Sequence, residues 1–451
     1  MPFRTFKLIP LFLALGGTVL AAPVQAQSLS ELLEAARGYD AAWQSARAQL
    51  DASTSRAEQA RAGLLPSAGL SAGLARANND IHTSAPVQLP NTSQTTQTVG
   101  VNASQPLYRP ANRIALAQGL RGIDIAQAQL DAATQDLLVR VSRGYFDVLA
   151  AQDTLGFVQA QKVAVAEQLA SAKRNFEVGT STITDTREAQ ARFDLITAQE
   201  IAAVNDLRVK RLALDQLVGQ TGTAPLPLAQ PLVLPTVAPD NVAAWVLRSQ
   251  DSQPQVRQAQ IALDVAELET RKAETGHLPT VDLQAGYNIQ RTPNGSQFLP
   301  GISSRAHSAS VGVALNLPLF AGFAVQNRVR ETLALEEKAR ADLENLRRAV
   351  AQNTRAAFFG VQSGLGQVRA LEAAEASSLS ALEANQLGYQ VGVRINIDVL
   401  NAQSQLFQTR RDLAQARYNV LLGTLQLRQS AGILLEGDVQ AIDALLAKDR
   451  R

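Results

Sequence analysis

The chain has 451 residues, of which 46% are apolar and 18% are charged, and it contains no Cys and three His. The lack of Cys excludes disulfides, thiolate metal sites, a Cys nucleophile and a lipid-modified N-terminal Cys. His82, His277 and His307 are too widely spaced along the chain to predict a zinc site or an imidazole-based catalytic centre. Aromatic residues make up only 5%, whereas Ala is abundant, which favours slender, closely packed helices over a thick core.

Residues 1–26 have the features of a secretory signal peptide. Arg4 and Lys7 form a basic n-region, and residues 8–21 form an apolar stretch that is short for a stable transmembrane helix. Small residues at the −3 and −1 positions predict cleavage before Gln27, with an uncleaved anchor as the alternative. Removing Arg4 and Lys7 lowers the 42 basic residues to 40, against 40 acidic ones, and this balance predicts no nucleic-acid partner.

Proline divides the rest of the chain. All Pro after the predicted signal fall within three zones, residues 66–110, 225–254 and 279–318. Because Pro is excluded from helix interiors, the Pro-free stretches 111–224 and 319–451 are predicted to hold very long helices. Residues 221–240 contain five Pro and are interpreted as a linker between two halves.

Strands are predicted where apolar residues alternate with polar or small ones. This period of two is clear over residues 281–289 and 311–317, and weaker over 68–74 and 99–103. One apolar and one polar face suit a lipid-facing barrel strand with a wet interior, although a soluble antiparallel sheet shows the same alternation. No later segment reaches about 18 consecutive apolar residues, so no helical membrane span is predicted.

The two halves repeat at an offset of 213 residues. Leu65-Pro66-Ser67 corresponds to Leu278-Pro279-Thr280, and Phe176-Glu177-Val178-Gly179 corresponds to Tyr389-Gln390-Val391-Gly392. A repeat of this length indicates a duplicated substructure of helix, β-hairpin, long helix and returning helix. We therefore divide the chain into a signal peptide, a first repeat, a linker, a second repeat and a C-terminal tail, at residues 1–26, 27–220, 221–240, 241–432 and 433–451.

The returning helix of the second repeat carries a heptad seam. Large apolar residues recur there every seven positions, at Val399, Leu406, Leu413, Val420 and Leu427. Small residues follow the first four of them at a spacing of three, which predicts a coiled coil with closely spaced helices. Gly179 and Gly392 are predicted to lie at the ends of the outgoing helices, because Gly accepts the left-handed conformation found there.

The four predicted strands cannot close a barrel by themselves. Open strand edges are not tolerated in lipid, so several subunits must contribute strands. A barrel of about eight strands is filled by its own side chains, whereas larger barrels open a lumen. We therefore expect a homotrimer with a 12-stranded barrel, in which two helical hairpins from each subunit form a tube.

With these features in place, the chain resembles the TolC family of outer-membrane export ducts. The resemblance covers essentially the whole mature chain and rests on Gly276-His277-Leu278-Pro279-Thr280, Pro318-Leu319-Phe320, residues 178–185, 389–401 and 432–438. It implies a mixed α and β fold with duplicated halves, long antiparallel coiled-coil hairpins and four transmembrane β-strands per protomer. The implied trimer continues its barrel into a periplasmic helical tunnel, with the C-terminal tail in the equatorial periplasmic region.

The resemblance also implies a function. The protein would be the outer-membrane exit duct of a tripartite efflux or type I secretion system, a channel rather than an enzyme, without cofactors. Its implied partners are a periplasmic adaptor (membrane fusion) protein, an inner-membrane ABC or proton-driven transporter and outer-membrane lipid. The implied location is the outer membrane of a Gram-negative cell, with a large periplasmic portion. The alternative is a periplasmic coiled-coil adaptor, which would have one hairpin between β-rich halves.

Four residues at the two helical tips match a latch that holds such ducts shut at the periplasmic end. They are Thr184 and Asp185 in the first turn and Tyr389 and Arg394 in the second. A phenol or guanidinium group bonded to a carboxylate contributes about 1.5–3 kcal/mol at best, which a docking partner can overcome. Helix capping is the alternative role for Thr184 and Asp185, because Thr and Asp favour helix N-termini.

Two further groups of tip residues receive roles by the same resemblance. A polar ring in the pore is matched by Asp398 and Asn401, and because Asn is uncharged, we expect weaker block by cations than six carboxylates would give. The turns that meet the adaptor are matched by Val178, Gly179, Val391 and Gly392.

Overall fold

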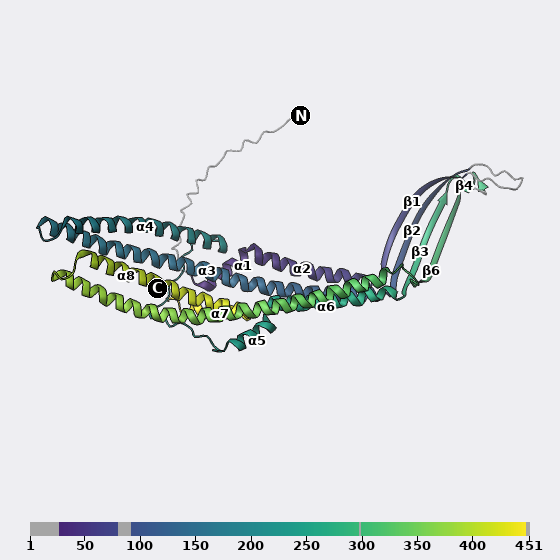
Figure 1. Ribbon diagram of the computed structural model, residues 1–451. Coiled ribbons are helices and arrows are strands. Elements are labelled where there is room, and N and C mark those ends of the chain that lie inside the picture. Colours follow the sequence, from purple (N-terminus) through teal and green to yellow (C-terminus); the bar gives the residue numbers. More distant parts are fainter. Residues whose placement is uncertain (1–26, 80–91, 297–298, 448–451) are drawn as a thin grey trace, which may run out of the picture.

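A computed structural model describes residues 27–79, 92–296 and 299–447 of the chain. The predicted signal peptide, residues 1–26, lies outside the described residues. The molecule is long and narrow (Figure 1). A bundle of long helices forms most of its length, and a curved β-sheet lies at the opposite end from the turns that join α3 to α4 and α7 to α8.

Each half contains two shorter helices, a β-hairpin of two long strands and two long helices, and the second half adds η1, β4 and β5 among the described residues. The first half contains α1 (Leu29–Tyr39), α2 (Ala41–Ala62), β1 (Ser67–Asn79), β2 (Thr92–Tyr108), α3 (Pro110–Glu177) and α4 (Ile183–Val218). The second contains α5 (Val242–Ser252), α6 (Pro254–Glu274), η1 (Thr275–His277), β3 (Thr280–Thr292), β4 (Gly295–Ser296), β5 (Leu299–Pro300), β6 (Ser304–Asn316), α7 (Ala324–Gln390) and α8 (Asn396–Ser430). A short helix, α9 (Glu436–Asp443), follows.

The predicted duplication is confirmed by element boundaries. Helices α2 and α6 begin at Ala41 and Pro254, and α4 and α8 begin at Ile183 and Asn396, each pair 213 residues apart. The outgoing helix α3 is continuous, as its Pro-free sequence predicts, and Pro110 lies in its first turn, where no backbone N–H is needed.

The long helices form two antiparallel hairpins, α3 with α4 and α7 with α8, and α8 also lies along α3 (Figure 1). All five large residues of the predicted heptad seam are at most 3% exposed. Gly364 of α7 lies where an added Cβ would be 3.0 Å from Val420, and Gly423 of α8 lies where one would be 3.3 Å from Val361. Small residues therefore let α7 and α8 approach closely, as the seam predicts.

The largest hydrophobic cluster lies partway along the bundle, where residues of α1, α3, α4, α8 and α9 meet. Tyr145 of α3 is fully buried there, and its hydroxyl donates to the carbonyl of Leu226 at 2.9 Å. The linker also pairs with the C-terminal segment, since Ala229 N–H donates to Leu445 and Ala447 N–H donates to Pro227. The linker is thus held against the first half by a buried hydroxyl and against the C-terminal segment by backbone bonds.

The main sheet has the strand order β1-β2-β3-β6, and every neighbouring pair is antiparallel. Its register places Leu70 opposite Val101, Val101 opposite Tyr287, and Tyr287 opposite Ala309. Large apolar side chains of one face are exposed, among them Leu70, Leu74, Val311, Val313 and Leu315. Among the helices of the described residues, none has the length and apolar character needed to cross a membrane.

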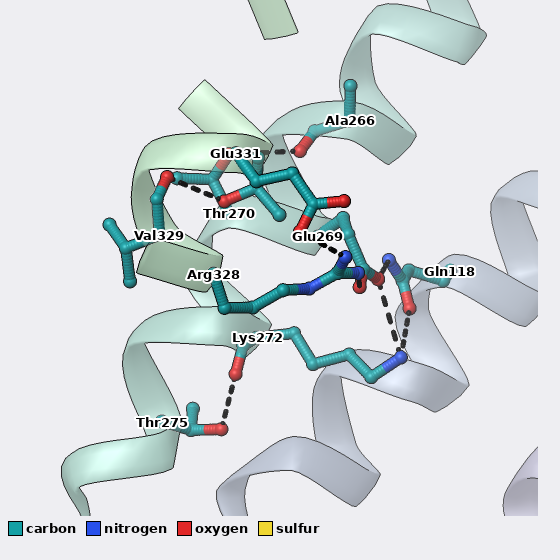
Figure 2. A network of polar contacts seen from close by, with 10 residues as sticks. Gln118, Ala266, Glu269, Thr270, Lys272, Thr275, Arg328, Val329 and Glu331 are labelled. Atoms are coloured by element: carbon teal, nitrogen blue, oxygen red, sulfur yellow. Dashed lines mark hydrogen bonds and ion pairs between the residues drawn. The ribbon is translucent and has the colours of Figure 1, made fainter. Parts of the chain in front are cut away.

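A polar network joins α3, α6 and α7 (Figure 2). The carboxylate of Glu269 accepts hydrogen bonds from Gln118 at 2.9 Å, Arg328 at 2.7 Å and Lys272 at 3.3 Å. These bonds, led by the one from Gln118, outweigh burial and lower the pKa of Glu269 below its ordinary value. One side chain of α6 therefore ties both long outgoing helices together.

Two corresponding glycines give a test of the packing. Gly219 and Gly432 both follow a returning helix with positive φ, at 71° and 70°. A Cβ added at Gly219 would overlap the ring of Tyr39, a side chain that is 58% exposed. A Cβ added at Gly432 would overlap backbone atoms of Gln253. Gly432→Ala is expected to destabilise by roughly 2–4 kcal/mol, because left-handed strain and overpacking add where the backbone cannot move.

Gly219→Ala is the matched control and is expected to cost less, since the Tyr39 ring can rotate away. The measurement is the guanidinium midpoint for loss of helical circular dichroism. Equal midpoints for the two variants would contradict the role given to the backbone of Gln253.

Candidate functional site at the helical tip

The turns that join α3 to α4 and α7 to α8 have the same backbone geometry. In the first, Gly179 N–H donates to Phe176 and Thr180 N–H donates to Asn175; in the second, Gly392 N–H donates to Tyr389 and Val393 N–H donates to Gly388. This pair of bonds defines a Schellman motif, and it requires the positive φ of 77° at Gly179 and 79° at Gly392. Sequence and structure agree that these glycines end the outgoing helices.

The predicted docking residues are displayed at the end of the molecule. Val178 is 73% exposed and Val391 is 66% exposed, and each directly precedes its turn glycine. The two turns lie at the same end of the bundle in Figure 1. Each turn therefore presents an exposed apolar side chain at the same end of the bundle, and the docking role of Val178, Gly179, Val391 and Gly392 stays a prediction.

The first turn is capped more tightly than the second. Oδ2 of Asp185 accepts from the backbone N–H of Thr182 and from the hydroxyls of Ser181 and Thr182, at 3.0, 2.7 and 2.8 Å. Burial acts to raise the pKa of Asp185, but these hydrogen bonds together hold that pKa below its ordinary value. The capping role considered for Asp185 is therefore present, while its other oxygen, Oδ1, makes no hydrogen bond among the described residues. Thr184 is exposed beside it.

The other two predicted latch residues have partners within the chain. The hydroxyl of Tyr389 accepts a hydrogen bond from the side-chain amide of Asn175 at 3.2 Å. Arg394 lies 3.7 Å from Asp398, a loose pair in which Arg394 is exposed and Asp398 is half-buried, and the Arg394 side chain passes directly over Gly388. Within one chain neither Tyr389 nor Arg394 bonds to Asp185, so the predicted latch is not formed by a single protomer.

The predicted ring residues lie on the first turns of α8. Asp398 is the partner of Arg394, and Asn401 accepts a hydrogen bond from Arg192 of α4 at 2.9 Å. Arginine beside both positions offsets the negative field expected from Asp398. The weaker cation block expected from Asn401 stays a prediction.

Sequence reasoning did not identify the polar bonds that join the two hairpins. Asn396 is fully buried at the start of α8, where its amide nitrogen donates to the carbonyl of Asp185 at 3.3 Å and its oxygen accepts from Gln168. Gln161 adds a bond to Ser404 at 3.4 Å. Buried amides are stable only when their partners are supplied, so Asn396 fixes how α8 lies against α3 and α4. The one available signal was a polar residue between Ile395 and Ile397.

Comparison with known proteins identifies the class. The model of the outer membrane efflux protein family matches residues 32–220 and 245–433, two stretches that are 213 residues apart. Outer membrane protein TolC of Vibrio cholerae serotype O1 is 34% identical over 438 residues, which cover 97% of this chain and 98% of that protein. Proteases secretion protein PrtF of Dickeya chrysanthemi is 30% identical over 452 residues, covering 98% of this chain and 95% of that protein.

A solved structure has the same fold. The outer membrane protein VceC of Vibrio cholerae matches with a TM-score of 0.77 and 19% identity, covering 90% of this chain and 96% of that one. The duplicated hairpins and the four-stranded sheet thus have the fold of that outer membrane protein. The chain belongs to the outer membrane efflux protein family.

Membership settles the broad function and the location. The protein is an outer-membrane exit duct of the efflux or type I secretion kind, in a Gram-negative cell, with a large periplasmic helical part. The alternative of a periplasmic coiled-coil adaptor is not favoured, because the family matches both repeats over almost their whole length.

Proposed function

We propose that three copies of this chain form one continuous duct. The observation that carries this proposal is that, among the described strands, β1 and β6 are edges without a second neighbour, on a sheet with one apolar, exposed face. An edge in a bilayer leaves backbone N–H and C=O groups without partners, at a cost of several kcal/mol for each group. Cyclic association removes all such edges at once and continues into a tube of helical hairpins.

We further propose that the helical tip is the gate. Oδ1 of Asp185 is left to accept, and the hydroxyl of Tyr389 accepts from Asn175 with its own proton still to donate. A latch between neighbouring subunits, with Asp185 and Thr184 of one facing Tyr389 and Arg394 of the next, would use these groups. Opening breaks few bonds at each subunit, so docking of a partner can supply the energy.

The partners in this proposal are a periplasmic adaptor protein and an inner-membrane ABC or proton-driven transporter. Support comes from the two similar turns that end in exposed Val178 and Val391, which suit contact with a partner below the tip. Relatives named for TolC and for protease secretion agree with such an assembly. The duct itself passes the substrate from the transporter across the periplasm and the outer membrane.

The first prediction concerns the assembly. Protein extracted from outer membranes in detergent is expected to have the mass of a trimer and to conduct ions in planar bilayers, because only the closed ring gives a wet pore. The measurements are light-scattering mass, corrected for detergent, and single-channel conductance. A monomer without conductance would contradict the proposal.

A second prediction concerns the latch. Tyr389→Phe combined with Arg394→Ala is expected to raise the open probability of single channels about fivefold or more, since loss of about 1 kcal/mol per subunit favours the open tip. Lys173→Ala is the matched control, because it removes an exposed cation of α3 near the same tip. Unchanged gating in the double variant would remove Tyr389 and Arg394 from the latch.

A third prediction concerns the ring. Asp398→Ala is expected to weaken block of the channel by divalent cations, because it removes the one carboxylate that each subunit contributes. Asn401→Asp is the opposite change and should strengthen the block. The measurement is the cation concentration that halves the bilayer current. If this concentration is the same for both variants as for the unaltered chain, Asp398 does not face the pore.

A further inference from the structure

The sheet contains one seam that already joins the two repeats. Strand β2 ends the hairpin of the first repeat and β3 begins the hairpin of the second, and they pair in antiparallel register from Gln97 with Arg291 to Gln105 with Leu283. Within the described part of the chain, the outer strands β1 and β6 each have a neighbouring strand on one side only. A ring of several copies would add a second kind of seam, in which β6 of one copy meets β1 of the next.

The duplication makes these two seams counterparts. Ser67 pairs with Ser104 in the first hairpin, and Thr280 pairs with Asn316 in the second. Strand β1 therefore corresponds to β3 at an offset of 213 residues, and β2 corresponds to β6 at an offset of 212. In a seam between two copies, β6 would therefore take the place that β2 has in the β2–β3 seam. Strand β1 of the second copy would take the place of β3.

We propose that β6 of one subunit pairs with β1 of the next in the register of the β2–β3 seam, so that Val313 lies opposite Leu74 of the partner subunit. The template for this pair is Val101 opposite Tyr287. This inference rests on the proposed ring of subunits and adds to it the residues that meet. The occupant of each edge is a second copy of this chain.

The proposed register keeps each face of the sheet uniform. It places Leu315 opposite Ala72 of the partner subunit on the apolar face, and Asn316 opposite Ser71 of the partner subunit on the other. At the two corresponding positions of the β2–β3 seam, Ala103 is paired with Ala285 and Ser104 is paired with Gln284. A slip of one residue would instead turn the apolar row of one strand toward the polar row of its neighbour.

The length of β6 gives an independent argument. Strand β2 continues beyond its pairing with β1 to Tyr108, and this last part is bonded only to β3, with a register shift between Pro106 and Tyr108. Strand β6 ends at Asn316, although its counterpart of Tyr108 is Phe320. Residues 317–320 are therefore the segment that would extend β6 if it were hydrogen-bonded to β1 of a second copy. There Leu319 is 90% exposed and Phe320 is 74% exposed.

One ion pair distinguishes the internal seam from the seam between subunits. Arg109 makes a two-point ion pair with Asp282 across the β2–β3 seam, with Nε–Oδ1 and Nη2–Oδ2 distances of 2.8 and 2.6 Å. The counterparts of these residues are Ala321 and Gly69, which carry no charge. Strand pairing and apolar contact alone therefore hold the seam between subunits.

The chain contains no Cys, so introduced pairs report the register directly. Directly opposite residues in an antiparallel pair have Cα atoms about 4.5–5.5 Å apart, which suits a disulfide, whereas positions displaced by two are about 7–8 Å apart. In oxidised outer membranes, Val313→Cys with Leu74→Cys should give covalent dimers and trimers on denaturing gels. Their yield should be at least about tenfold that of Val313→Cys with Ala72→Cys or with Arg76→Cys.

Three controls keep the result decisive. Leu315→Cys with Ala72→Cys tests the same register at a second place, in case the first pair prevents folding. Val101→Cys with Tyr287→Cys should oxidise within one chain without raising its mass, which shows that the oxidant reaches the sheet. The third control is the set of single substitutions from the two between-subunit pairs, namely Val313→Cys, Leu74→Cys, Leu315→Cys and Ala72→Cys. None of them should give a trimer ladder.

The outcomes separate the register from the ring itself. A ladder from a displaced pair, or no ladder while the internal pair oxidises and the mass is that of a trimer, overturns the proposed register. A monomeric mass overturns the proposed function, and the pairing fails with it. A ladder from Val313→Cys with Leu74→Cys and from Leu315→Cys with Ala72→Cys supports both.

Discussion

Burial of the heptad seam along α8 is the constraint on which the rest of the molecule depends. This helix packs against α7 through Leu406, Leu413 and Val420, and it also inserts Leu400 into the cluster between α3 and α4. Because one helix is shared by both hairpins, the two cannot slide past each other without exposing apolar surface. This packing keeps the α3–α4 and α7–α8 turns together at one end of the molecule and the strands of the two repeats adjacent at the other end.

Much of this architecture could be predicted from the sequence, because its signals are periodic. The absence of Pro after Pro110 predicts α3, the spacing of seven predicts the buried side of α8, and the offset of 213 predicts the second half. Such patterns repeat over many residues, so errors at one position do not matter. Boundaries followed from chemistry as well, since Gly179 and Gly392 end their helices with positive φ.

The bonds at the tip could not be predicted in the same way. Whether Asn175 reaches Tyr389 depends on how α7 is rotated against α3, and whether Gln168 reaches Asn396 depends on how α8 is rotated against α3. No local sequence pattern encodes those angles. Asp185 illustrates the difficulty: its residue type suits a cap and a latch equally, and only the geometry assigns one oxygen to the cap. Functional polar pairs are few and specific, so a single sequence carries little statistical signal for them.

The unequal capping of the two tip turns has a consequence for how such a protein can change over generations. In a ring of half-length chains every turn would be encoded by the same codons, and any substitution would alter all of them together. Here Thr182 and Asp185 stabilise the start of α4, whereas the corresponding Ile395 offers α8 no side-chain cap. Covalent fusion of the repeats therefore lets one turn remain firm while the other is free to diverge toward looser, more easily displaced contacts.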